Sequence, residues 1–156
     1  YLSKKIKIAF GIIAQGKVSQ SALEARSLGF LRSTDQISIN GDSLVSDSIK
    51  TILNMIDEGY KSPHPVNIPV LGSSALSNLK VEMHQLLRGN YISEYDHFLG
   101  TKLGYVLSGG DCQTLQNVSE NYLLDLEREC FLGLCGNIKS QERIKFMLKR
   151  GTPLRN

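Results

Sequence analysis

Apolar side chains recur at three- and four-residue spacing along most of the chain, with polar residues between them. This spacing is typical of amphipathic helices, because it places the apolar side chains on one face. Most of the segments that show it are followed by a glycine, the residue most common just after a helix. We therefore predict a mainly α-helical protein with about seven helices, near residues 3–15, 21–28, 42–58, 76–88, 93–108, 119–135 and 140–150.

Several of these helices begin with side chains that can accept hydrogen bonds from free backbone N–H groups. Ser21 and Glu24 have the spacing of a capping box, and Asp96 stands three residues after Ser93. Ser140 is the expected cap of the last helix. These residues define where the helices should start.

Two of the predicted helices carry notable apolar faces. The third has a single packing stripe, formed by Val45, Ile49, Ile52, Leu53 and Ile56. The first is apolar on more than one side, through Ile6, Ile8, Ala9, Phe10, Ile12 and Ile13. A surface helix of a monomer shows one stripe, so we expect the first helix to pack against another subunit or another part of a longer protein, and the isolated chain to self-associate.

One short segment has the pattern of a strand, and one has the composition of a linker. Residues 36–40 alternate polar and apolar, so at most one short strand is expected. Residues 60–72 contain three prolines, which disfavour helix and predict an extended surface connection. The predicted domains are therefore residues 1–59, the Pro-rich connection 60–72 and a second helical set at 73–156.

Charge and composition narrow the class of protein. The net charge of +3 includes no run of Lys or Arg longer than two, so no nucleic-acid partner is expected, and no apolar segment is long enough for a membrane span. The three cysteines are an odd number without metal-ligand spacing, which favours free thiols in a reducing, cytoplasmic setting. The chain opens with Tyr1 inside a helical pattern, so we expect a fragment of a longer protein.

The histidines do not form a predicted catalytic or metal-binding group. His97 lies three residues after Glu94, a spacing that suits a surface pair at least as well as an oriented base. His84 and His64 have no second ligand at metal-binding spacing. We expect no metal site.

Other candidate motifs also have structural explanations. Gly109 and Gly110 follow a helix rather than a strand, so we interpret them as a helix end and not as a phosphate or oxyanion loop. The acids Asp125, Glu127 and Glu129 are two residues apart, so neighbouring ones point in different directions on a helix. Neither nucleotide-binding fingerprint, GxGxxG or GxxxxGK[ST], is present. No catalytic, cofactor-binding or metal-binding residue is predicted.

A basic cluster near the C-terminus is the one candidate for ligand contacts. The phosphates of coenzyme A could bind to four basic side chains beside Phe146 and Met147, namely Lys145, Lys149, Arg150 and Arg155. The alternative is a cationic last turn that stabilises the helix through its dipole. A small acyl-CoA-binding helical protein is therefore one hypothesis for function.

Several longer strings resemble a known enzyme family. They are residues 16–31 (GKVSQSALEARSLGFL), 118–129 (VSENYLLDLERE), 134–136 (LCG), 141–144 (QERI) and 153–156 (PLRN), with 91–93 (YIS) and 109–111 (GGD). Together they resemble the C-terminal part of bacterial 3-hydroxyacyl-CoA dehydrogenase/enoyl-CoA hydratase fusions of fatty-acid β-oxidation, in the region after the crotonase-type hydratase core.

This resemblance implies a role within a larger enzyme. Residues 1–59 would be the helical end of a crotonase-like domain, and 73–156 a helical cap and tail that helps assembly. The parent enzyme would use NAD and acyl-CoA thioesters, with catalytic residues elsewhere, and would form a homo-oligomer and associate with a thiolase subunit. The alternative hypothesis is a freestanding helical protein-interaction module.

Overall fold

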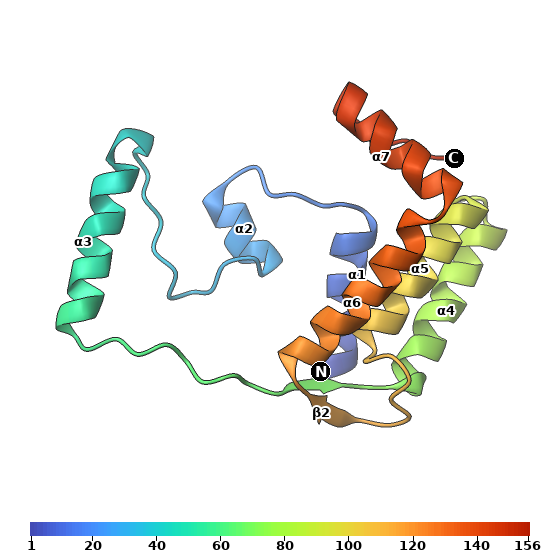
Figure 1. The fold of residues 1–156 in the computed structure, drawn as a ribbon, viewed down its shortest axis with the longest axis horizontal. Coiled ribbons are helices and arrows are strands. Elements are labelled where there is room, and N and C mark those ends of the chain that lie inside the picture. Colours follow the sequence, from blue (N-terminus) through green and yellow to red (C-terminus); the bar gives the residue numbers. More distant parts are fainter. The chain divides into compact units, whose positions relative to one another are not determined.

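The computed structural model describes residues 1–156 and is mainly α-helical. Its elements are α1 (Leu2–Ala14), α2 (Ala22–Leu28), η1 (Gly41–Ser43), α3 (Leu44–Asp57), β1 (Ile68–Val70), α4 (Ser73–Arg88), α5 (Glu94–Leu107), β2 (Gln116–Val118), α6 (Glu120–Cys135) and α7 (Ile138–Arg150) (Figure 1). Seven α-helices confirm the predicted fold class. No helix combines the length and the apolarity that crossing a bilayer requires.

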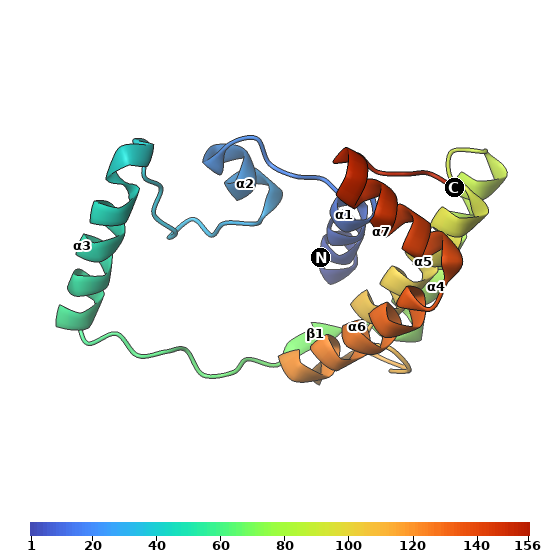
Figure 2. The same ribbon diagram turned by 45° about the horizontal axis from the view of Figure 1, so that its top comes forward.

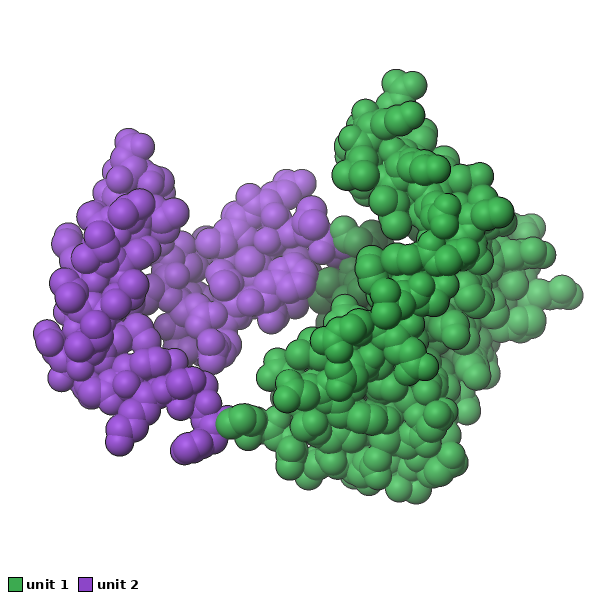
Figure 3. All heavy atoms as spheres, viewed as in Figure 1, with its two compact units in different colours: residues 1–16, 65–156 green, residues 17–64 purple.

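The chain forms two compact units (Figure 3). Unit 1 consists of residues 1–16 and 65–156, and unit 2 consists of residues 17–64. The sequence analysis grouped the first helix with residues 17–59. In the structure, α1 packs within unit 1 instead, because its apolar side chains find partners on α5.

Helix α5 lies at the centre of unit 1 and contacts α4, α1 and α6. In Figures 1 and 2, α4, α5 and α6 run side by side. Two α5 glycines face α4, and a Cβ at Gly100 would lie 2.3 Å from Cε of Met83. The missing side chain therefore lets α4 and α5 approach closely.

The core of unit 1 is small and forms where three helices meet. Phe10 of α1 contacts Leu79 and Met83 of α4, and all three are at least nine-tenths buried. Partly buried apolar side chains surround them, including Leu103 and Leu107 of α5. Burying a side chain of this size stabilises a fold by about 1.5–3 kcal/mol, so Phe10 anchors α1 to the unit.

The sheet differs from the sequence prediction. Residues 36–40 form no strand; β1 and β2 instead pair antiparallel, with Ile68 opposite Val118 and Val70 opposite Gln116. β1 lies inside the Pro-rich segment, where the strand tolerates Pro69 because a two-stranded sheet consists of edges only. In the 36–40 segment, side chains bond to α3 instead, through Ser38 Oγ to Asp47 Oδ2 at 2.5 Å.

Unit 2 contains α2, η1 and α3. Ser21 accepts a hydrogen bond from Glu24 N–H, as the capping-box spacing predicts, and the Glu24 carboxylate accepts one from Gln20 N–H at 2.8 Å. The predicted third helix is confirmed as α3, but the side chains of its apolar stripe are all more than half exposed. The stripe is therefore not the packing face of this unit.

The starts of α5 and α7 test two of the predicted N-caps, of which one is confirmed and one is wrong. The α5 capping box is confirmed: Ser93 Oγ accepts from Asp96 N–H, and the Asp96 carboxylate accepts from Ser93 N–H. The predicted cap of the last helix is wrong. Asn137, not Ser140, caps α7, and Ser140 is buried one turn into the helix with its hydroxyl 2.7 Å from Tyr95 Oη.

Replacing Gly72 with alanine is expected to lower the free energy of unfolding by about 3 kcal/mol. Gly72 has φ 65° and ψ −151°, a region that L side chains rarely enter. A Cβ there would also lie 2.5 Å from the carbonyl oxygen of Cys112. Chemical denaturation followed by circular dichroism measures the loss.

Gly133→Ala is the matched control. Gly133 lies inside α6, and a Cβ there would meet no atom within 4 Å. Because alanine favours helix over glycine by about 1 kcal/mol, this variant should be as stable as the parent or slightly more stable. Equal losses in the two variants would contradict the backbone conformation described for Gly72.

Candidate functional site

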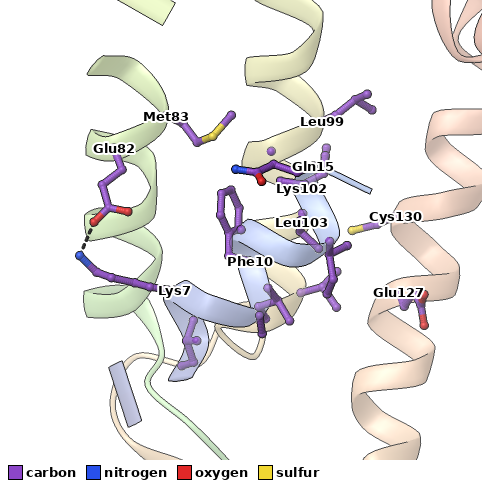
Figure 4. A pocket seen from close by; sticks show the side chains of 18 of the residues that line it. Lys7, Phe10, Gln15, Glu82, Met83, Leu99, Lys102, Leu103, Glu127 and Cys130 are labelled. Carbon is purple, nitrogen blue, oxygen red and sulfur yellow. Dashed lines mark hydrogen bonds and ion pairs between the residues drawn. The ribbon is translucent and has the colours of Figure 1, made fainter. Parts of the chain in front are cut away.

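Unit 1 contains an open apolar groove with a volume of about 1550 Å³ (Figure 4). It is lined by residues of α1, α4, α5 and α6, with Arg155 of the C-terminal tail at its edge. The lining includes Phe10, Ile13, Leu103, Leu124, Cys130 and Phe131. Small-molecule sites usually have volumes of about 300–1,000 Å³, so this groove is larger than a small ligand needs.

The environment of α1 explains why the groove is apolar. Phe10 points towards Met83 and Leu103, whereas Ile8 and Ile13 are both 52% exposed (Figure 4). The prediction that α1 has apolar surface on more than one side is confirmed. The part that α4 and α5 do not cover contributes Ile13 to the wall of the groove.

Charged side chains also line the groove, and some of them are paired. Lys7 of α1 forms an ion pair with Glu82 of α4, shown by the dashed line in Figure 4. Lys102 lies 5.9 Å from the centroid of the Phe98 ring. Glu127 of α6 also lines the groove. The lining of the groove is thus mainly apolar and includes charges of both signs.

A buried ionic network lies at the start of α5 and holds the C-terminal tail. Asp96 Oδ1 accepts hydrogen bonds from Arg143 Nη1 at 2.7 Å and from Arg155 Nη1 at 3.0 Å. The Asp96 and Arg143 side chains are only 12% and 15% exposed. Arg143 also donates to Asn156 Oδ1 at 2.7 Å, so one guanidinium joins α5, α7 and the tail.

The network changes the acidity of Asp96. Burial by itself would raise the pKa of this carboxyl group, but the hydrogen bonds from Arg143, the Ser93 N–H and Arg155 outweigh it and lower the pKa below the usual value. Asp96 is therefore held as a carboxylate. Its role is to fix the start of α5 against α7.

A second polar cluster surrounds the glycine pair after α5. Gly109 and Gly110 have φ values of 89° and 67°, which confirms that they end the helix. Tyr122 Oη donates to the Gly109 carbonyl at 3.1 Å, and Gln116 Nε2 lies 2.6 Å from Sγ of the buried Cys112. These contacts join α6 and β2 to the end of α5.

Two tyrosines near this cluster have raised pKa values. Burial, followed by the neighbouring Asp111, raises the pKa of Tyr105 to about 12. Burial and the adjacent Cys112 also raise the pKa of Tyr122. Both phenols stay protonated at neutral pH, so they act as hydrogen-bond donors and not as bases.

The structure separates most of the residues that the sequence singled out. His64 is exposed in unit 2. His84 of α4 and His97 of α5 meet edge to face, with ring centroids 6.5 Å apart. Asp125 pairs with Arg128 on the exposed side of α6. No group of three or more His, Cys, Asp or Glu side chains is arranged to hold a metal ion.

The predicted contacts for coenzyme A phosphates lie on α7. Lys145, Lys149 and Arg150 are exposed there, and none of them lines the apolar groove. Arg155, the fourth basic candidate, binds Asp96 instead. The structure therefore does not bring these cations together with the groove.

Sequence reasoning missed the ionic network. The spacing of Ser93 and Asp96 indicates a cap, but the partner Arg143 lies 47 residues further along the chain. No local pattern marks that pairing. The one available sequence signal was in the tail after α7. Arg155 and Asn156 there have polar side chains that can bind to another part of the chain.

Replacing Asp96 with asparagine is expected to lower the free energy of unfolding by about 2 kcal/mol at pH 7, since it leaves Arg143 buried without its carboxylate. The lowered pKa means that the contribution of Asp96 is complete above its unfolded pKa of about 4 and is lost as the pH falls through the folded value. The difference between parent and variant should therefore shrink below pH 4. Urea denaturation at a series of pH values measures it.

Asp125→Asn serves as the control for this prediction. Asp125 and Arg128 are 68% and 66% exposed, and solvent weakens such pairs to less than about 1 kcal/mol. This variant should differ little from the parent at any pH. A loss as large as that of Asp96→Asn would mean that burial of the network is not the source of its stability.

Comparison with known proteins gives one match. Over 147 residues the chain is 42% identical to a probable 3-hydroxyacyl-CoA dehydrogenase of Bacillus subtilis (strain 168). The match includes 94% of this chain but 19% of the relative, so the chain spans about a fifth of the length of the curated protein it matches. No family model and no solved structure matches the chain. The dehydrogenase part of the predicted resemblance is confirmed at this level.

Proposed function

We propose that this chain is a helical scaffold segment of a larger 3-hydroxyacyl-CoA dehydrogenase that acts in fatty-acid oxidation. The observation that carries this proposal is the 42% identity over 147 residues to the Bacillus subtilis protein. The parent enzyme would oxidise 3-hydroxyacyl-CoA thioesters with NAD. The groups that bind NAD and act on the hydroxyl would belong to other parts of that enzyme.

The geometry of the site supports a role in assembly. A catalytic site needs a nucleophile or base, a group that orients it and a place for the reacting atom. The clusters around Asp96 and Tyr122 instead join helices to one another. The groove is apolar and larger than a small ligand needs, which suits packing against another protein segment.

The finer features of the proposal follow from the resemblance. The parent would also contain a crotonase-like enoyl-CoA hydratase domain, and this chain would cover its core. A cytoplasmic homo-oligomer and association with a thiolase subunit are part of the same proposal. Lys145, Lys149 and Arg150 are retained as proposed contacts to coenzyme A phosphates, since they are exposed and basic.

A freestanding helical interaction module is the second candidate function. The exposed apolar stripe of α3 and the open groove of unit 1 favour it, because both offer surface to a partner. The size of the native gene product distinguishes the two candidates. A product no longer than this chain would contradict the scaffold proposal.

The activity test uses the full gene product and the isolated chain side by side. Production of NADH from 3-hydroxyacyl-CoA, and hydration of 2-enoyl-CoA, are expected from the full product and not from the isolated chain. A full product that turns over neither thioester would contradict the proposed enzyme. Turnover by the isolated chain that a point substitution abolishes would contradict the scaffold role.

The assembly role has its own prediction in the full product. Ile13→Asp places a charge in the wall of the groove, so it should reduce the fraction of enzyme in its native assembly at least about tenfold, as measured by light scattering. The control is Ile39→Asp, since Ile39 is 99% exposed and should tolerate the same change. Equal behaviour of the two variants would show that the groove has no partner.

A further inference from the structure

The apolar stripe of α3 has the spacing of a helix-pairing seam. Val45, Ile49, Ile52 and Ile56 are separated by four, three and four residues, which is the alternation of a and d positions in a heptad. Their exposed fractions are 71, 53, 55 and 64%, and Leu53 beside them is 55% exposed. An exposed apolar stripe of this kind commonly marks a site of interaction with a protein or a membrane.

The rest of unit 2 packs on the other side of α3. Thr51 Oγ1 bonds Gln36 Oε1 at 2.8 Å, and Asp47 accepts from Ser38. Thr51 and Asp47 lie on the face of the helix away from the stripe, because at about 100° of rotation per residue both project more than about 120° from the centre of the stripe. The segment 36–40 therefore lies along the polar side, and unit 2 leaves its own apolar stripe open.

The charges around the seam favour a protein partner over a lipid surface. Helices that lie on membranes are rich in Lys and Arg on their polar face. The polar face of α3 and its ends carry Asp42, Asp47, Asp57 and Glu58 against a single Lys50, so anionic lipid would repel it. The seam itself is flanked by Ser46, Ser48, Leu53 and Met55, which are uncharged.

We propose that the α3 stripe is a homodimer interface in which it pairs with α3 of a second copy of this chain. Uncharged flanks allow two identical seams to approach without like-charge repulsion. The five exposed apolar side chains offer roughly 500 Å² per copy, or about 1,000 Å² for two copies, which is close to the smallest area of a biological interface. The dimer should therefore be specific and weak, and the proposal does not depend on the identity of the enzyme.

The test begins with a chain of residues 1–156 and sedimentation velocity across a hundredfold range of concentration. The parent is expected to show a reversible monomer–dimer equilibrium. Ile49→Asp should raise the dimer dissociation constant at least about tenfold, because it buries a charge in the seam. Asn54→Asp places the same charge on the opposite face of α3 and should leave the constant unchanged. Circular dichroism of each variant verifies that α3 stays helical.

A charge-pair experiment then tests direct contact between the two helices. Ile52→Glu and Ile52→Lys should each be monomeric, and their mixture should form a one-to-one heterodimer if the helices are parallel. Ile52→Glu mixed with Ile49→Lys gives the same rescue if they are antiparallel. Restoration by either mixture supports the proposal. The proposal is overturned if the unsubstituted chain stays monomeric at all concentrations, or if its dimer is unaffected by Ile49→Asp and by both mixtures. Binding of anionic vesicles without self-association also overturns it.

Discussion

The close approach of α4 and α5 is the contact on which the rest of unit 1 depends. Gly100 faces Met83 across this contact, and a Cβ in its place would overlap the Met83 side chain. With the two helices this close, Leu79 and Met83 form a surface that Phe10 can cover. α6 then packs on α5, and the open side between α1 and α6 becomes the groove. A bulkier side chain at Gly100 would change both the surface on which α1 packs and the shape of the groove.

The ionic network adds direction to this packing. Apolar contacts alone are non-directional, whereas Asp96 accepts hydrogen bonds from two guanidinium groups and from a backbone N–H in a set geometry. It therefore fixes the start of α5, the angle of α7 and the path of the tail at one point. Because the Asp96 and Arg143 side chains are both largely buried, loss of either one leaves the other as a charge that solvent stabilises poorly. The tail behaves as part of the fold.

The sequence predicts the helices of this protein well and its tertiary contacts poorly. The helical periodicity, the Ser21 and Ser93 caps and the glycine pair after α5 are local signals, and the structure has them where they were expected. The predicted strand at 36–40 is wrong. Alternation shows only that a segment could pair in a sheet, and this segment has no strand beside it to pair with. β1 was missed because Pro69 and the two prolines shortly before the strand dominate the local pattern. The Asp96–Arg143 pair and the groove each join residues distant in sequence, so no spacing rule marks them.

The insertion of residues 17–64 between α1 and β1 has a consequence for folding. α1 can dock on α4 and α5 only when the ends of a 48-residue segment come together. The entropy of closing such a loop grows with the logarithm of its length, so doubling the segment would cost only about 0.6 kcal/mol. α4, α5 and α6 are close in sequence and can associate first, with α1 joining a preformed surface. A change in the length of this segment should therefore have little effect on the stability of unit 1.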